Sequence, residues 1–531
     1  MTRPPRPAGP AALAASAVAF AALVAGAPLV SPSSQTFSRS RWIVEHERAG
    51  MRFSGGVLPA SSSPAMEALL SLPASTSPLT SPSSPTTAPR RKPAGPRDLR
   101  VSFDILPPDA GSAAQPETEA EPTLAIDPAD GRRLLGGYQE DRFDDGGARA
   151  LTYALSTDGG RHWGEGLLPH LTQASGGEFQ RASDPWLAFG PAHRAYFASI
   201  AFDETDARSA IALSVSADGG ASWADPVLVH ELTQGGLDDK DAVAVDGDPR
   251  SPFFGRVYVG WDISPSDTSQ PQPQVIARSS DGGATFGPPV VIQPQGVNLG
   301  IIPVVGPGGV VTAVWLHFPG GGPAPGSIES AYSTDGGDTW SAPVEIATGV
   351  VVGVSGLRTG EGLPSAAVDP RKGTVYVVWE DQRFTPGVDQ IALSVSADGR
   401  GGWSPPRRVS DGPDWAPSFS PAVAANARGA IGIAYYSLRN SARNSQVLAD
   451  EYIASGDPRK KTFGRGQRLS AASWDVRFAA MTEGGFFLGD YQGLATNGTA
   501  FMPLWIATFA PSTLEAGARQ PDAYVLAPAG R

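Results

Sequence analysis

The chain has 531 residues, contains no cysteine and carries a formal net charge of −12. The absence of cysteine excludes disulfides, thiolate metal sites and a cysteine nucleophile. The acidic balance lacks the basic face that phosphate backbones require, so we expect no nucleic-acid partner.

The first segment has the pattern of an export signal. Arg3 and Arg6 precede an apolar run over residues 11–27, which ends in the small residues Ala25–Ala27. A charged start, an apolar run and an A-x-A site are the parts of a secretory signal peptide. We therefore expect residues 1–27 to be removed and the protein to be secreted without a membrane span. The alternative is an uncleaved anchor, because the run approaches the length that crosses a bilayer.

Residues 28–97 follow as a low-complexity linker rich in Ser, Thr and Pro. Such a composition cannot bury a hydrophobic core, so we expect a flexible spacer. The repeats described next place one folded domain at residues 98–510. Residues 511–531 form a tail that contains a candidate closing strand.

A short motif recurs along the folded domain. Its first copy is STDGGRHW at residues 156–163, and the aspartates of the five good copies are Asp158, Asp218, Asp281, Asp335 and Asp398. An apolar or alternating segment runs into each copy and a short strand candidate follows it, as in a β-hairpin whose glycines supply positive φ. The aspartate can accept hydrogen bonds from the turn's own N–H groups, so we interpret these residues as structural. Contact with a ligand is the alternative.

The spacing of the motif predicts an all-β chain. Successive aspartates of the good copies lie 54 to 63 residues apart, which is enough for the four strands of one β-propeller blade. Seven inner strand pairs can be counted, but only six hairpins. A strand from the other terminus would complete the last blade and remove the exposed sheet edge. Residues 100–106 and 523–528 are the candidates, and seven blades are favoured over six.

The motif is similar to the Asp-box, or BNR repeat, of the sialidase (neuraminidase) superfamily, which reads Ser-x-Asp-x-Gly-x-x-Trp. The resemblance covers about residues 120 to 510. It implies a glycan-directed propeller, six blades in catalytic domains, and boxes on the periphery. For a retaining sialidase it further implies three arginines that hold the substrate carboxylate, a Tyr–Glu nucleophile and an acid/base aspartate. The Arg-Ile-Pro triplet of the first arginine is absent; Ile301–Pro303 is the nearest match and lacks the Arg.

Candidate site residues lie where inner strands begin or second strands end, because these positions line the channel face of a propeller. The candidate catalytic residues are Asp184, Asp241, Glu361, Glu380, Asp490 and Tyr491. The candidate substrate-binding residues are Arg181, Arg358, Arg383 and Tyr436. The alternative is that such carboxylates cap loops and pair with arginines.

Two classes of function remain open at this level. One is a secreted glycoside hydrolase that uses channel-face carboxylates on an extracellular glycan or glycoprotein. The other is a non-catalytic propeller that binds glycan or protein. We expect a monomer without a cofactor or a histidine-based metal centre. Calcium held by clustered aspartates stays open, although no spacing signals it.

Overall fold

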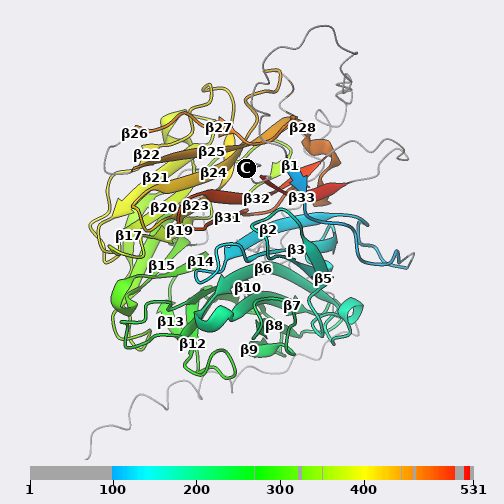
Figure 1. The fold of residues 1–531 in the computed structure, drawn as a ribbon, viewed down its shortest axis with the longest axis vertical. Helices are drawn as coiled ribbons and strands as arrows, with labels where there is room; N and C mark the ends of the chain where they lie inside the picture. Colours follow the sequence, from blue (N-terminus) through cyan, green and yellow to red (C-terminus); the bar gives the residue numbers. More distant parts are fainter. Residues whose placement is uncertain are drawn as a thin grey trace, which may run out of the picture. The chain divides into compact units, whose positions relative to one another are not determined.

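The two ends of the described chain meet in one sheet. In Figure 1 the blue β1 (Asp98–Arg100) lies beside the red β33 (Pro521–Leu526). The computed structural model describes residues 98–526, except 110, 268, 321–325, 350, 361, 444, 446, 458–461, 483 and 509–519. The signal peptide expected at 1–27, the linker expected at 28–97 and the candidate Glu361 lie outside the described residues, as does the expected tail apart from 520–526.

The first eight strands, β2 to β9, form two groups of four that a single pair, Ala148 opposite Ala182, joins into one eight-stranded antiparallel sheet; we count these groups as the first and second sheets. The third and fourth sheets follow along the chain, and each contains four antiparallel strands. The first contains β2 (Glu119–Ile126), β3 (Leu134–Arg142), β4 (Ala148–Ser156) and β5 (Gly164–Leu167). The second contains β6 (Arg181–Phe189), β7 (Ala195–Phe202), β8 (Ser209–Ser216) and β9 (Val227–Leu232). The third contains β10 (Leu237–Val245), β11 (Val257–Ser264), β12 (Gln274–Ser279) and β13 (Val290–Gln293). The fourth contains β14 (Val297–Val305), β15 (Val311–Phe318), β16 (Ser327–Ser333) and β17 (Val344–Thr348).

The remaining sheets continue the same order. The fifth contains β19 (Ser365–Val368), β20 (Val375–Asp381), β21 (Gln390–Ser396) and β22 (Arg407–Arg408). The sixth contains β23 (Ser418–Ala425), β24 (Ile431–Ser437) and β25 (Leu448–Asp457), with β26 (Thr462–Phe463), β27 (Gln467–Arg468) and β28 (Trp474–Asp475) along β25. The seventh contains β31 (Gly493–Thr496), β32 (Phe501–Thr508), β33 and β1. The prediction of an all-β chain is confirmed for the described residues, and several of its sheets are four-stranded and antiparallel.

The closing strand differs in extent from the expected segments. β1 pairs with β33 from Asp98 opposite Leu526 to Arg100 opposite Tyr524, and Val101 N still donates to Ala523 O at 2.7 Å. The strand expected at 100–106 does not continue, because Asp104 has a φ of 49°, which leaves the extended region.

Short helical turns and one small extra sheet fill the connections. The 3₁₀ turns are η1 (Gln173–Ser175), η2 (Pro191–His193), η3 (Pro307–Gly309), η4 (Gln382–Phe384) and η6 (Val476–Phe478). The extra sheet, which we call the cover sheet, contains β18 (Leu357–Arg358), β30 (Gly485–Phe487) and β29 (Ala480–Thr482). None of the helical turns in the part of the chain that the structure describes has the length and apolarity of a membrane-crossing helix.

Large aromatic side chains fill the space between successive sheets. Trp261, Trp315, Trp379 and Trp505 stand on the second strands of four sheets, and each is fully buried. Trp261 belongs to a cluster that includes Tyr196 of the preceding sheet, so one ring serves two sheets. Aromatic burial of this kind contributes much of the stability of a core.

The repeated motif forms the same turn in the first four sheets. In the third, Ser279 Oγ donates to Asp281 Oδ1 at 2.6 Å, and Thr285 N donates to the same oxygen at 3.0 Å. Gly283 N donates to Ser279 Oγ at 2.9 Å, and its φ of 90° requires glycine. The equivalent turns contain Asp158, Asp218 and Asp335; the fifth copy departs, since Ser396 Oγ donates to Gly401 O and not to Asp398. These bonds are local to the turn, as a structural role requires.

Candidate functional site

The first strands of five sheets are bent at one equivalent position. A register shift interrupts their pairing with the second strand. The residue inside the shift has a positive φ: 53° at Glu121 and Asp184, 51° at Lys240, 70° at Gly300 and 44° at Ser420. Such a bulge re-aims a side chain, and a left-handed conformation in a residue other than glycine persists only where its surroundings hold it. The repeated bulge therefore gives successive sheets the same means of aiming one side chain.

Three of these side chains meet, together with Asp490 from the start of the seventh sheet. Lys240 Nζ lies 2.8 Å from Asp490 Oδ2, 3.1 Å from Asp184 Oδ2 and 3.4 Å from Glu121 Oε1. Lys240 is 4% exposed and Asp490 5%, while Glu121 and Asp184 are fully buried. We call these four residues the channel cluster. Their side chains stand on β2, β6 and β10 and on the segment just before β31, so residues far apart in the sequence meet here.

Two arginines extend the channel cluster toward the cover sheet. Arg358 of β18 donates to Asp490 Oδ2 at 2.8 Å, and Arg142 at the end of β3 donates to Gln139 Oε1 at 2.5 Å. Both guanidinium groups lie over the ring of Phe487 on β30, at 4.6 Å and 4.3 Å from its centroid. The cover sheet thus packs on the channel cluster through a cation–π arrangement and a salt bridge.

The carboxylates of the channel cluster are held in different states. Burial and the charge of Asp184 raise the pKa of Glu121 to about 8. Burial alone would also raise the pKa of Asp490, but the charges of Arg358 and Lys240 outweigh it and lower that pKa. Burial opposes the charge of Lys240, yet Asp184, Asp490 and Glu121 outweigh it and raise its pKa. One acid kept neutral beside another kept ionised is an arrangement found in acid/base sites.

A small cavity of about 30 Å³ adjoins the channel cluster. Its wall includes Lys240, Asp241 and Asp490 beside the aromatic rings of Trp186 and Tyr491. The two rings meet edge to face with centroids 5.2 Å apart. A cavity of this size has room for one or two water molecules, whereas sites for drug-sized ligands measure about 300–1,000 Å³.

The structure brings five of the predicted site residues to this cavity or to the channel cluster: Asp184, Asp241, Arg358, Asp490 and Tyr491. Burial, with the charge of Asp184, raises the pKa of Asp241. Tyr491 Oη donates to Pro185 O at 3.0 Å. Lys240 was not among the predicted site residues, although its position matches that of Glu121 and Asp184 when the inner strands EPTLAID, DPWLAFG and KDAVAVD are aligned.

Other predicted residues take different partners. Glu380 Oε1 accepts from Ser420 N at 2.7 Å, and Tyr436 Oη accepts from Ile506 N at 2.8 Å. Arg181 pairs with Asp145 at 2.6 Å, and Arg383 pairs with Asp381 at 2.6 Å. Of the three predicted substrate arginines, Arg358 forms a salt bridge with Asp490 of the channel cluster, whereas the salt bridges of Arg181 and Arg383 are with aspartates outside it.

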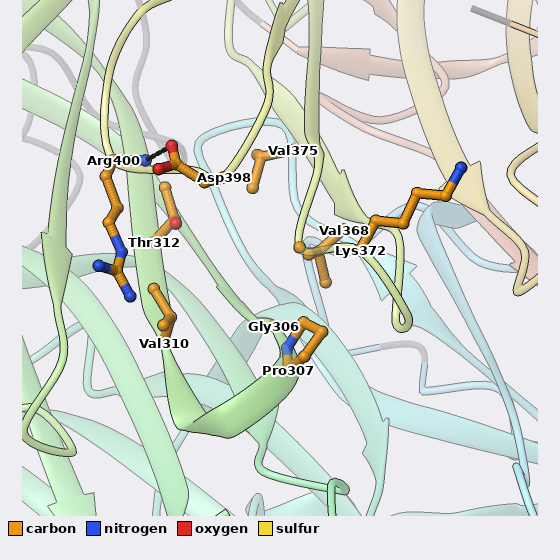
Figure 2. A pocket seen from close by; sticks show the side chains of 10 residues that line it. Gly306, Pro307, Val310, Thr312, Val368, Lys372, Val375, Asp398 and Arg400 are labelled. Carbon is orange, nitrogen blue, oxygen red and sulfur yellow. Dashed lines mark hydrogen bonds between the residues drawn. The ribbon is translucent and has the colours of Figure 1, made fainter.

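A second cavity of about 120 Å³ lies between the fourth and fifth sheets (Figure 2). Its wall contains Thr312, Val375 and the turn of the fifth repeat, where Arg400 N donates to Asp398 Oδ1 at 3.0 Å. Arg400 and Lys372 are the cationic side chains of its lining. This cavity is separate in its residues from the channel cluster.

Comparison of the sequence with protein-family models and with curated proteins gives no match. Among solved structures, the chain is similar to a Hadza microbial sialidase at 12% identity, covering 74% of this chain and 73% of that one, with a TM-score of 0.43. It is similar to an α-L-arabinanase from Penicillium chrysogenum at 14% identity, covering 81% and 98%, with a TM-score of 0.42. A protein of unknown function from Dyadobacter fermentans matches at 16% identity, covering 65% and 95%, with a TM-score of 0.42.

Proposed function

We propose that this protein is a secreted β-propeller of seven blades that binds an extracellular glycan at the channel end marked by Lys240. The observation that carries the proposal is the meeting of Glu121, Asp184 and Asp490 around that lysine, next to the rings of Trp186 and Tyr491. Carboxylates accept hydrogen bonds from hydroxyl groups, and aromatic rings offer an apolar face, so carboxylates and aromatic rings side by side suit the binding of a sugar. Opening of the cover sheet admits the ligand, since the adjoining cavity of about 30 Å³ is smaller than a sugar.

The hydrogen bonds of the tyrosine hydroxyl groups and the salt bridges of the arginines favour binding over sialidase catalysis. Tyr491 donates its hydroxyl to a backbone carbonyl, and Tyr436 accepts from a backbone amide, so neither is paired with a glutamate in those bonds. Arg181, Arg358 and Arg383 form salt bridges with different aspartates. A substrate carboxylate needs arginines that converge on it.

A hydrolase of another glycoside class is the second candidate, and the split pKa values favour it. Glu121, with a pKa of about 8, is protonated at neutral pH, whereas the pKa of Asp490 is lowered. Both contact Lys240 Nζ, at 3.4 Å and 2.8 Å, so these two oxygens are no more than about 6 Å apart, a limit that admits the ~5–5.5 Å separation of the carboxyl groups in a retaining glycosidase. Glu121 would serve as the acid and Asp490 as the nucleophile or base.

The test combines a glycan array with a panel of fluorogenic sialosides and neutral glycosides. Wild type, Asp490→Asn and the control Asp411→Asn are compared after thermal unfolding shows that each is folded. Asp411 suits as a control because it pairs with Arg439 near the sixth sheet, apart from the channel cluster. We expect array binding that Asp490→Asn weakens at least tenfold and Asp411→Asn leaves unchanged.

The other outcomes separate the candidates. Turnover of a glycoside that Asp490→Asn abolishes in a folded protein would replace binding by hydrolysis. Absence of both turnover and array binding in the wild-type protein would refute the glycan role.

A further inference from the structure

Three carboxylates meet where the two ends of the described chain join the first sheet. Asp522 stands on β33, Asp104 follows β1, and Glu119 opens β2. One oxygen atom from each lies within 4.8 Å of the others. We call these residues the closure cluster. The cluster is separate in its residues from the channel cluster.

Glu119 lacks the partners that a buried carboxylate requires. Its side chain is fully buried, and neither of its oxygens accepts a hydrogen bond from any described residue. Asp104 Oδ1 is also buried without a partner among the described residues. Buried polar groups are almost always satisfied, because leaving one without a partner costs several kcal/mol. One oxygen of Glu119 lies within 4.8 Å of oxygens of Asp104 and Asp522, and its lack of a partner among the described residues indicates a missing positive charge at this position.

Among the described residues, Arg100 is the cation that contacts this cluster, and it is already engaged. Arg100 Nη2 contacts Asp104 Oδ2 at 2.8 Å and Asp522 Oδ1 at 2.5 Å. Its salt bridges are with these two aspartates and not with Glu119, and a further acid, Glu140, stands opposite Glu119 in the β2–β3 pair. One of the oxygens of Glu140 is likewise buried without a partner among the described residues. The acids therefore outnumber the cation.

We propose that Asp104, Glu119 and Asp522 bind a calcium ion. The donors are oxygens alone, which suits a hard cation and not zinc, whose usual ligands include nitrogen or sulfur. Three protein carboxylates that converge on one point suit calcium, which takes about six to eight oxygen ligands in flexible geometry, whereas magnesium keeps several of its waters and is usually bound by one or two carboxylates. Water supplies the remaining ligands.

Such an ion would hold the closure of the propeller. Its ligands come from the N-terminal segment, the first sheet and the last strand, where β1 pairs with β33 over three residue pairs and Arg100 forms a salt bridge with Asp522. An ion that binds the folded state and not the unfolded chain shifts the unfolding equilibrium toward the folded protein. Calcium would therefore resist the opening of the ring at the point where the chain ends meet.

The experiment uses the full chain, first treated with a chelator and dialysed free of it. Calorimetric titration with CaCl2 and thermal unfolding with and without CaCl2 or MgCl2 are measured for wild type, Glu119→Gln and Glu451→Gln. Glu451 is the matched control, since it is a fully buried glutamate on β25 of the sixth sheet, outside the closure cluster. Asp104→Asn, at a half-buried position, tests the site again if Glu119→Gln does not fold.

We expect one calcium ion per chain and a rise of the melting temperature by several degrees. Glu119→Gln or Asp104→Asn should weaken calcium binding at least tenfold and remove that rise, while Glu451→Gln should keep both. A wild-type protein that neither binds calcium nor gains stability would overturn the proposal. An equal response to magnesium would overturn the choice of calcium, and full binding by Glu119→Gln would overturn the assignment of the ligands.

Discussion

Replacement of Lys240 by methionine should lower the free energy of unfolding by about 3–5 kcal/mol, the cost of removing one partner from a buried ion pair. The lysine is 4% exposed and lies 2.8–3.4 Å from three carboxylates that are themselves buried. Methionine keeps most of the stem volume, so the loss reports on charge and not on packing. The value should fall toward the lower end of that range, because Arg358 still pairs with Asp490 in the variant.

Urea unfolding followed by tryptophan fluorescence measures this loss, and its pH dependence tests the cause. In the wild-type protein the pKa of Asp490 is lowered, so its contribution is present above the pKa of about 4 of an unfolded aspartate and is lost as pH falls. The variant lacks much of this contribution, so its deficit should shrink as pH falls below 4. Lys372→Met, at an exposed lysine, should stay within about 0.5 kcal/mol of wild type. A loss below 1 kcal/mol for Lys240→Met at pH 7 would refute the reasoning.

Two further predictions concern the repeated turns and export. Hydrogen bonds from Ser222 and Thr339 lower the pKa values of Asp218 and Asp335 to about 2, so the stability these turns contribute should be full above pH 4 and disappear toward pH 2. Acid unfolding of the wild-type protein and of Asp218→Asn measures this contribution. The free energy of unfolding of the variant should fall less steeply between pH 4 and pH 2, and parallel curves for the two proteins would contradict the prediction. N-terminal sequencing of secreted protein should give a start near residue 28, whereas an intact Met1 in a membrane fraction would favour the anchor.

The fold could be predicted from the repeats, because each repeat contains the residues that specify its own β-hairpin. Ser279, Asp281 and the glycines after them specify a turn through bonds within a few residues, and such local chemistry can be read without a structure. The count of strand pairs and hairpins predicts that a strand from one terminus completes the last blade. β1 is such a strand, but the residue at which it ends could not be predicted. The left-handed φ of Asp104 breaks the strand, and nothing in the alternation of residues 100–106 signals it.

The candidate site was predictable only in part, since its contacts link residues far apart in the sequence. Asp184 lies at the bulge of β6 and Asp490 just before β31, near the strand starts that the pattern indicates, but which side chain neutralises them depends on the order of sheets around the closed ring. The cover sheet was not predicted because β18 has two residues and pairs with β30 across more than a hundred intervening positions. Propensity and periodicity give no signal for strands this short.

The two acidic clusters of the fold share one electrostatic problem and differ in the source of their positive charge. Carboxylates that are buried together repel one another and lose hydration, so each group needs a cation or a proton. In the channel cluster the chain supplies the cation as Lys240, aimed by its bulge at a φ of 51°, with Arg358 beside it. In the closure cluster Arg100 reaches two of the acids and leaves Glu119 without a partner among the described residues. A covalently attached cation makes the channel cluster independent of solution ions, whereas the stability of the closure should vary with calcium.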